Sequence, residues 1–159
     1  MTTGGFTTCL WFDGQAEEAA DFYLSVFKDG QRGRVSRFTE AGPGEPGSVL
    51  GVEFTVNGQN FVAVNGGPEF TINEAVSFQI HCADQEEVDY YWARLTENGG
   101  QEVQCGWLKD RFGVSWQVVP AILFDWLADP APSRAAATAR AMYQMKKLDI
   151  PTLRSAHST

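Results

Sequence analysis

The chain has 159 residues, 43% of them hydrophobic, and a formal net charge of −8 from 20 acidic and 12 basic residues. This length fits one domain or two very small ones and provides enough apolar side chains for a packed core. Nucleic acid is not expected as a partner, because the basic residues are scattered and would neutralise few phosphates.

Residues 1–8 contain neither the basic segment nor the apolar run of a secretory signal peptide. No later stretch approaches the roughly 20 apolar residues that span a bilayer, so no membrane association is expected. The three cysteines, Cys9, Cys82 and Cys105, form no CxxC motif. A disulfide framework and a thiolate zinc cluster are therefore not indicated, and a reducing cytoplasm is the expected location.

Two segments of the chain repeat one pattern. Thr8–Gly30 and Ser77–Gly99 align without a gap at a constant offset. In each copy an apolar or alternating run predicts a strand, and a polar turn follows it. Apolar residues three or four positions apart then predict an amphipathic helix. The repeat indicates a duplicated supersecondary unit.

Each copy continues with three further predicted strands. In the first copy, a loop rich in Gly and Pro and the hairpin signal Asn57-Gly58 separate them. The order β-α-β-β-β is therefore predicted twice, over about residues 6–65 and 75–119, in an α+β fold. The predicted strands are Thr8–Asp13, Arg34–Thr39, Val49–Val56, Gln59–Val64, Val76–Cys82, Glu102–Cys105, Gly106–Lys109 and Val114–Val119.

Residues 120–159 are predicted to form a helical extension to the paired modules of residues 1–119. A short helix is expected over Ala121–Ala128, and the prolines that follow end it. Ser133 is expected to cap a second helix that runs to Leu148 and stops before Pro151. The tail, Thr152–Thr159, is expected to be frayed.

Four segments of the chain together resemble one known superfamily. They are FDGQAEEAADFY, NGGPEF, SFQIHCADQEEVDYYW and CGWLKDRFGVSWQVVP. They are similar to the vicinal-oxygen-chelate superfamily of glyoxalase I, bleomycin-resistance proteins and extradiol dioxygenases. Within it they resemble the PhnB-like branch, often labelled demethylubiquinone methyltransferase-like. The resemblance covers about Phe6 to Ile150 and implies two modules that form a U-shaped mixed sheet around a cavity.

The resemblance also implies where a divalent metal would bind. Superfamily members that use a metal hold it with about four side chains, one from each of four strands. Those positions correspond here to Thr8, Ser77 and Gln117, with a fourth near Ala63 or Asn65. Because such sites need imidazole or carboxylate ligands, a metal is not expected in the standard place. The chain also shows no glycine-rich nucleotide loop after a strand, so the methyl transfer in the label is not expected.

Strand alternation assigns one row of side chains in each strand to the cavity. In the fifth strand Phe78, Ile80 and Cys82 are apolar and should lie under the helix, which turns the alternate residues toward the cavity. The equivalent row is Thr8, Leu10 and Phe12 in the first strand, and Phe61, Ala63 and Asn65 in the fourth. The ligand-binding candidates are therefore Thr8, Phe12, Asn65, Ser77, Gln79, His81, Trp107 and Gln117. By contrast, Trp11, Trp92 and Trp116 are expected in the core.

Several of these candidates also have a structural explanation. His81 could act as an acid, a base or a lone metal ligand, or it is a hydrogen-bonded histidine at the rim of the sheet. Gln79 and Gln117 either bind a ligand amide or hydroxyl, or fill the cavity by bonding to each other. Trp107 is either a stacking platform for a planar ligand, or a residue of the core or of an interface. Cys105 is either a nucleophile or a small packing residue.

Three functions remain open. The first is a protein that binds a small organic ligand in the cavity without the standard metal. The second is a metal-assisted lyase, isomerase or oxygenase of the same superfamily. The third is a non-catalytic structural or regulatory dimer. A homodimer that uses the C-terminal helices is expected in each case, because Met142, Met145 and Leu148 need a surface to bury against.

Overall fold

The computed structural model describes residues 5–158 of the chain. It divides into two compact units, Met1–Ile72 and Asn73–Thr159. The absence of a signal segment was predicted partly from residues 1–4, which lie outside the described range. No helix among the described residues is long and apolar enough to cross a membrane.

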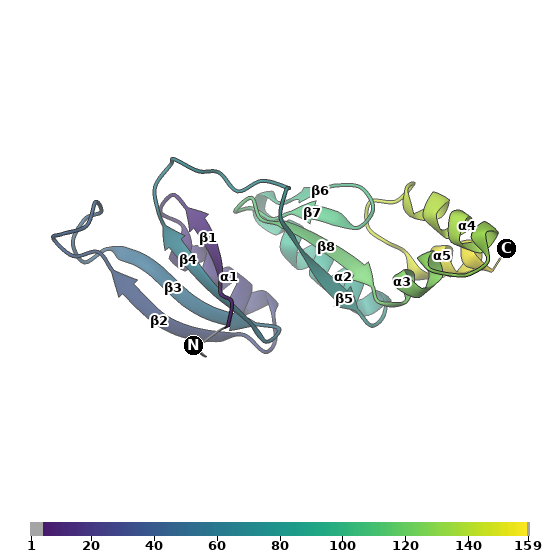
Figure 1. The fold of residues 1–159 in the computed structure, drawn as a ribbon, viewed down its shortest axis with the longest axis horizontal. Helices are drawn as coiled ribbons and strands as arrows, with labels where there is room; N and C mark the ends of the chain where they lie inside the picture. The colour runs from purple at the N-terminus through teal and green to yellow at the C-terminus, as the bar shows by residue number, and fades with distance from the viewer. Residues whose placement is uncertain (1–4, 159) are drawn as a thin grey trace. The chain divides into compact units, whose positions relative to one another are not determined.

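The first unit is a four-stranded mixed sheet with one helix packed on one face (Figure 1). The strand order is β1-β4-β3-β2. The β1–β4 pair is parallel, and the other two pairs are antiparallel. The elements are β1 (Thr8–Phe12), α1 (Ala16–Val26), β2 (Gln31–Arg37), β3 (Val49–Val56) and β4 (Gln59–Asn65).

The second unit repeats this topology, with the strand order β5-β8-β7-β6 and a parallel β5–β8 pair. The predicted order β-α-β-β-β is thus confirmed in both copies, as is the α+β class. The enclosure of one cavity by both modules stays a prediction. The elements are β5 (Ser77–Cys82), α2 (Gln85–Thr96), a 3-10 turn η1 (Glu97–Gly99), β6 (Gln101–Glu102), β7 (Trp107–Lys109) and β8 (Ser115–Pro120).

The core of the first unit lies between α1 and its sheet. Phe61 of β4 stacks on Phe54 of β3 with ring centroids 5.2 Å apart, and Phe54 in turn stacks on Tyr23 of α1. Leu10 and Phe12 of β1 are buried as well. The prediction that Leu10, Phe12, Phe61 and Ala63 face a ligand cavity is therefore wrong, because all four are core residues.

For β1, the error arises from the length of one turn. Three residues, Asp13 to Gln15, join β1 to α1, whereas only Ala83 and Asp84 join β5 to α2. The first copy therefore has one extra residue between strand and helix, and a gapless alignment shifts β1 by one position. A shift of one residue moves every side chain of a strand to the opposite face. Backbone bonds confirm the corrected register, because Gly66 N–H donates to Phe12 O as Ala121 N–H donates to Cys82 O.

Three helices, not two, follow β8, and they pack in the second unit (Figure 1). The helix predicted from Ser133 to Leu148 ends early, at Met142, and starts with Pro132 rather than with Ser133 as its cap. The prediction of a frayed tail is wrong for residues 152–157, which belong to a helix that Asp149 caps by accepting a bond from Thr152 N–H. Thr159 lies outside the described residues. The helices are α3 (Ile122–Leu127), α4 (Pro132–Met142) and α5 (Ile150–His157).

Proline explains the error in the tail. Pro151 occupies the first turn of α5, where the missing N–H group costs nothing, so it begins a helix instead of ending one. Leu153 then reaches a buried cluster with Val119, Leu123 and Leu148. The terminal helices thereby form a small core of their own on the end of the second sheet.

Candidate ligand-binding site

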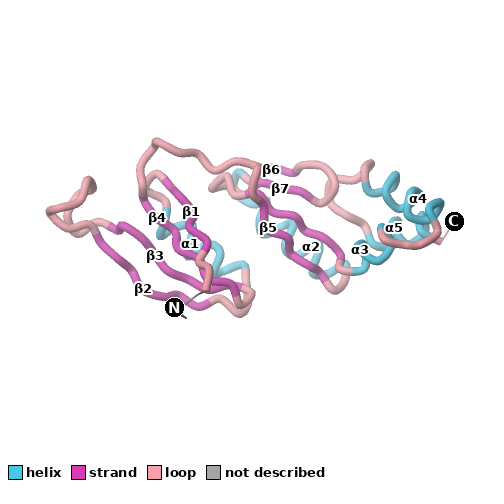
Figure 2. The backbone as a smooth tube through the Cα atoms, viewed as in Figure 1, coloured by secondary structure: helices cyan, strands magenta, loops and turns pink. Residues whose placement is uncertain are grey.

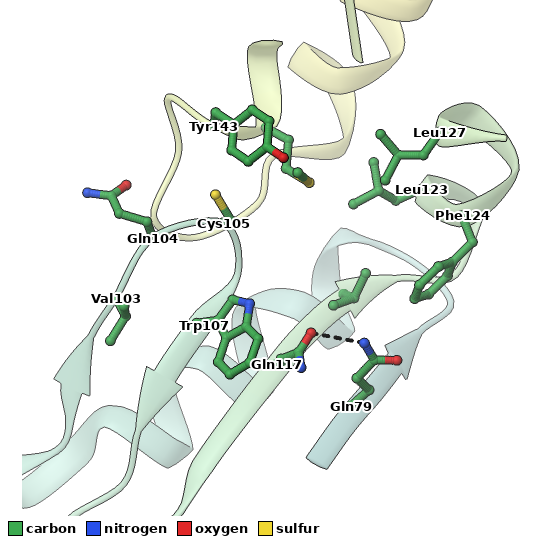
Figure 3. A pocket seen from close by; sticks show the side chains of 12 residues that line it. Gln79, Val103, Gln104, Cys105, Trp107, Gln117, Leu123, Phe124, Leu127 and Tyr143 are labelled. Atoms are coloured by element: carbon green, nitrogen blue, oxygen red, sulfur yellow. Dashed lines mark hydrogen bonds between the residues drawn. The ribbon is translucent and has the colours of Figure 1, made fainter. Parts of the chain in front are cut away.

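Three polar side chains form a hydrogen-bonded row across the second sheet. Gln79 of β5 lies opposite Gln117 of β8 in the parallel ladder. The Gln79 Nε2 donates to Gln117 Oε1 at 2.9 Å (Figure 3). Gln117 Nε2 in turn donates to Ser77 Oγ at 2.8 Å. The row faces away from α2, because the alternate residues Ile80 and Cys82 are buried. The prediction that Ser77, Gln79 and Gln117 lie together is confirmed by these contacts.

The bonds within the row fix the direction of each amide. Gln117 uses its oxygen for Gln79 and its nitrogen for Ser77. The row therefore presents the Gln79 carbonyl oxygen at one end and the Ser77 hydroxyl at the other. His81 Nε2 lies 3.5 Å from Gln79 Oε1, which is too long for a strong hydrogen bond. A ligand N–H group can therefore compete for this oxygen.

A pocket of about 510 Å³ opens beside the row. Its volume falls within the range of small-molecule sites. Apolar side chains from α3 and α4 face Trp107 and Gln117 across it (Figure 3). None of the lining residues is charged. They are Gln79, Val103, Gln104, Cys105, Trp107, Gln117, Val119, Leu123, Phe124, Leu127, Met142 and Tyr143.

A tight turn before β7 positions Trp107 at the pocket. Cys105 and Gly106 both adopt positive φ, and their N–H groups donate to Met145 O at 2.8 Å and Lys146 O at 2.7 Å. A side chain at Gly106 would lie 2.9 Å from Leu148 Cδ1 and from the Val118 carbonyl oxygen. The segment after α4 is thus held against the turn, and Trp107 pairs with Gln117 in the β7–β8 ladder.

The two catalytic candidates lie at different places around this pocket. Cys105 lines it. His81 is exposed beside it, with its ring edge-to-face against Phe124 at 5.3 Å. A catalytic role for either residue stays a prediction. Another cysteine, Cys82, is ruled out as a nucleophile, because burial, with smaller contributions from nearby carboxylates, raises the pKa of its thiol to about 12.

The first-unit candidates are not part of this pocket. Phe12 is only 4% exposed and belongs to the core. Asn65 accepts a bond from Ala16 N–H at 2.9 Å and donates to Val49 O at 3.0 Å, so its amide anchors the start of α1. Thr8 is half-buried at the start of β1. Trp11, predicted in the core, is instead half-buried on the face opposite α1.

Sequence reasoning missed the wall formed by the C-terminal helices. Leu123, Phe124, Leu127, Met142 and Tyr143 line the pocket, although the pattern of these helices was interpreted as a dimer surface. The signal was their amphipathic spacing, which shows that one face must be covered but not what covers it.

Comparison with known proteins identifies the family. The family described as 3-demethylubiquinone-9 3-methyltransferase matches residues 4–119. A solved structure from Bacillus cereus, described as a putative 3-demethylubiquinone-9 3-methyltransferase, PhnB protein, is 37% identical. The match covers 73% of this chain and 98% of that chain, with a TM-score of 0.66. The chain belongs to this family. No curated protein matches it.

Two more distant structures share the fold of this 3-demethylubiquinone-9 3-methyltransferase (PhnB) family member. Protein PA1353 from Pseudomonas aeruginosa is 20% identical over 70% of this chain and 92% of that chain, with a TM-score of 0.57. The fosfomycin resistance protein FosX from Listeria monocytogenes is 18% identical over 73% of this chain and 90% of that chain, with a TM-score of 0.50. That FosX structure contains Mn(II) and a dihydroxypropylphosphonic acid.

The residues of this PhnB family member do not fit a divalent transition metal. The polar row consists of one hydroxyl and two amides that already bond to one another. His81 supplies a single imidazole, whereas a stable site of this kind needs several imidazole or carboxylate ligands. Among residues 5–158, no group of three or more His, Cys, Asp or Glu side chains is placed to hold a metal ion.

Proposed function

We propose that the protein binds a small, uncharged, planar organic molecule in the pocket of the second unit, without a divalent metal. The observation that carries this proposal is the lining itself: a pocket of about 510 Å³ with apolar and aromatic walls, an oriented pair of amides and no charged side chain. Burying an ionised group there would cost several kcal/mol, because nothing in the lining compensates its charge.

The chemistry of the row indicates what such a ligand carries. The Gln79 oxygen accepts a hydrogen bond, and the amide nitrogens of Gln79 and Gln117 donate them. A ligand with one donor and one acceptor on a planar group, such as a carboxamide, complements this pair. Trp107 provides an aromatic surface for the rest of the molecule.

The direct test uses a matched pair of probes, 2-naphthamide and 2-naphthoate, which share their rings and differ in charge. Amide chemical shifts in ¹⁵N-labelled full-length protein report where each probe binds. We expect 2-naphthamide to shift residues around Gln79, Trp107, Gln117 and Leu123, and 2-naphthoate to leave them unchanged. Equal binding of both probes at these residues would show that the pocket does not select against charge.

The row itself is tested by Gln117→Leu. This change removes both of its hydrogen bonds and is expected to weaken 2-naphthamide about tenfold, the equivalent of one hydrogen bond of about 1.4 kcal/mol. Gln59→Leu is the control, because Gln59 is an exposed strand glutamine of the first unit. An unchanged Kd in Gln117→Leu contradicts the proposed role of the row.

The alternative of a metal-assisted enzyme makes a separate prediction. Elemental analysis of protein purified without chelators is expected to find no stoichiometric divalent ion. One manganese, zinc, nickel or iron per chain would overturn metal-free binding and favour the lyase, isomerase or oxygenase alternative.

A further inference from the structure

We propose that a pocket of the first unit is a second ligand site and binds a planar aromatic carboxylate. The site is a pocket of about 740 Å³ at the carboxyl ends of β1 and β4. The β2–β3 loop, residues 38–48, contributes residues 38, 39 and 42–44 to the pocket lining. Figure 2 shows the path of this loop between β2 and β3. Aromatic and aliphatic side chains form its walls, among them Trp11, Phe38, Leu50 and Val64.

The indole of Trp11 is fixed in place. Its Nε1 donates to Gly67 O at 2.9 Å, and Phe70 packs edge-to-face on it at 5.1 Å. The backbone at Gly66 lies so close that a Cβ atom there would be 2.2 Å from two indole carbons. The ring therefore cannot move toward Gly66, and it contributes a rigid wall to the pocket.

The ring of Phe38 is held in the same way by the β2–β3 loop. A Cβ atom at Gly44 would lie 2.5–2.7 Å from three ring carbons, and one at Gly42 would lie 3.0 Å from another. The loop is itself tied, since Phe38 N–H donates to Ser48 O and Gly47 N–H donates to Phe38 O, both at 2.9 Å. Two aromatic rings, each packed against glycine backbone, thus line one pocket. Such rigid aromatic walls lower the entropy cost of binding a flat ring.

A cation at the pocket selects the polar group of the ligand. Arg37, the last residue of β2, lines the pocket, and its Nη1 donates to Gly47 O at 3.0 Å. This bond orients the planar guanidinium, whose remaining N–H groups suit a carboxylate. Asp13 is the one acidic residue in the lining, and it opposes an anion. Its effect has the opposite sign to that of Arg37, which makes the charge preference testable.

The experiment titrates 2-naphthoate into ¹⁵N-labelled full-length protein. We expect the shifted amides to cluster at Trp11, residues 38–44 and Gly66-Gly67. We expect Arg37→Gln to weaken binding about fivefold, as for a charge-assisted contact of an exposed side chain. We expect Asp13→Asn to strengthen it by about twofold to threefold at low ionic strength.

Two further variants test the aromatic wall. Gly44→Val places a side chain against the Phe38 ring and should abolish binding, and its backbone conformation is open to L-residues because Gly44 does not have positive φ. Phe38→Ala, which removes the ring without crowding the loop, should weaken binding about tenfold. The proposal of a second site would be wrong if 2-naphthoate changed amide chemical shifts over the whole chain, or mainly around Trp107. An unchanged Kd in both Phe38→Ala and Arg37→Gln would overturn it as well.

This outcome is independent of the proposed function, because 2-naphthamide reports on the second unit and 2-naphthoate on the first. Gln117→Leu serves here as the control and should leave 2-naphthoate binding unchanged.

Discussion

Asp110 anchors the turn between β7 and β8, and we expect Asp110→Asn to destabilise the protein severely. The side chain is only 3% exposed. Its Oδ1 accepts from Phe112 N–H at 2.9 Å and from Val114 N–H at 3.0 Å, and its Oδ2 accepts from Trp116 Nε1 at 2.8 Å. Three buried donors therefore depend on one carboxylate.

The size of the effect follows from these three bonds. An asparagine keeps the oxygen that serves Phe112 and Val114, but it places an NH₂ group where Trp116 needs an acceptor. Losing a charge-assisted bond and leaving buried donors unpaired costs about 2–3 kcal/mol. Trp116→Phe removes the indole donor, so in that background Asp110→Asn is expected to cost about 1 kcal/mol, a coupling of about 1–2 kcal/mol.

Urea unfolding followed by circular dichroism measures these free energies for the two single variants and the double variant. Asp125→Asn in α3 is the matched control, because Asp125 is exposed, and a change within about 0.5 kcal/mol is expected. The anchoring role is wrong if Asp110→Asn is as stable as this control, or if it costs the same with and without the Trp116 indole.

Three further outcomes are expected. Gly66→Ala, whose Cβ would overlap the Trp11 indole, should lower the free energy of unfolding by about 1–3 kcal/mol in urea unfolding. Leu153→Ala should cost about 2–5 kcal/mol, because Leu153 is fully buried in the cluster under the terminal helices, and calorimetry would show it as a lower Tm. The bond from Lys147 lowers the pKa of Asp89, and that from Thr152 lowers the pKa of Asp149. Because both pKa values are lowered on folding, the stabilisation is present above the unfolded pKa of about 3.9 and is lost as pH falls through the folded values. Tm should therefore fall less steeply in Asp89→Asn than in the unmodified protein as pH is lowered from about 5 to about 2.5. An equal slope in the two proteins would contradict the predicted role of Asp89.

The topology was predictable because it depends on local periodicity and on a repeat. Alternation in Val49–Val56 and the Asn57-Gly58 hairpin placed β3 and β4 correctly, and the second copy followed by analogy. In the second unit the prediction of the exposed face of β5 was also correct, because Phe78, Ile80 and Cys82 form one clearly apolar row. There the predicted neighbours Ser77, Gln79 and Gln117 do bond to one another.

The first unit was harder because both rows of β1 are apolar. Leu10 and Phe12 on one face and Cys9 and Trp11 on the other give alternation no contrast to detect. The face then depended on the alignment, and the extra residue beside Gly14 made the alignment wrong. The walls of the pocket in the second unit could not be predicted for a different reason. They come from α3 and α4, and helix amphipathicity contains no information about which strand a helix packs near.

The longer turn after β1 also determines how the two halves of the chain differ. Gly14 adopts φ of 86°, a conformation that favours glycine, so the added residue is accommodated without strain. Deleting one residue of this turn would shift β1 by one position. Trp11 would then lie beneath α1, and Phe12 would be exposed on the opposite face. The register of β1 relative to α1 therefore depends on a difference in length, which point substitutions in the turn do not change. The length of this turn therefore sets which row of β1 side chains lies under α1 and which row lies on the opposite face.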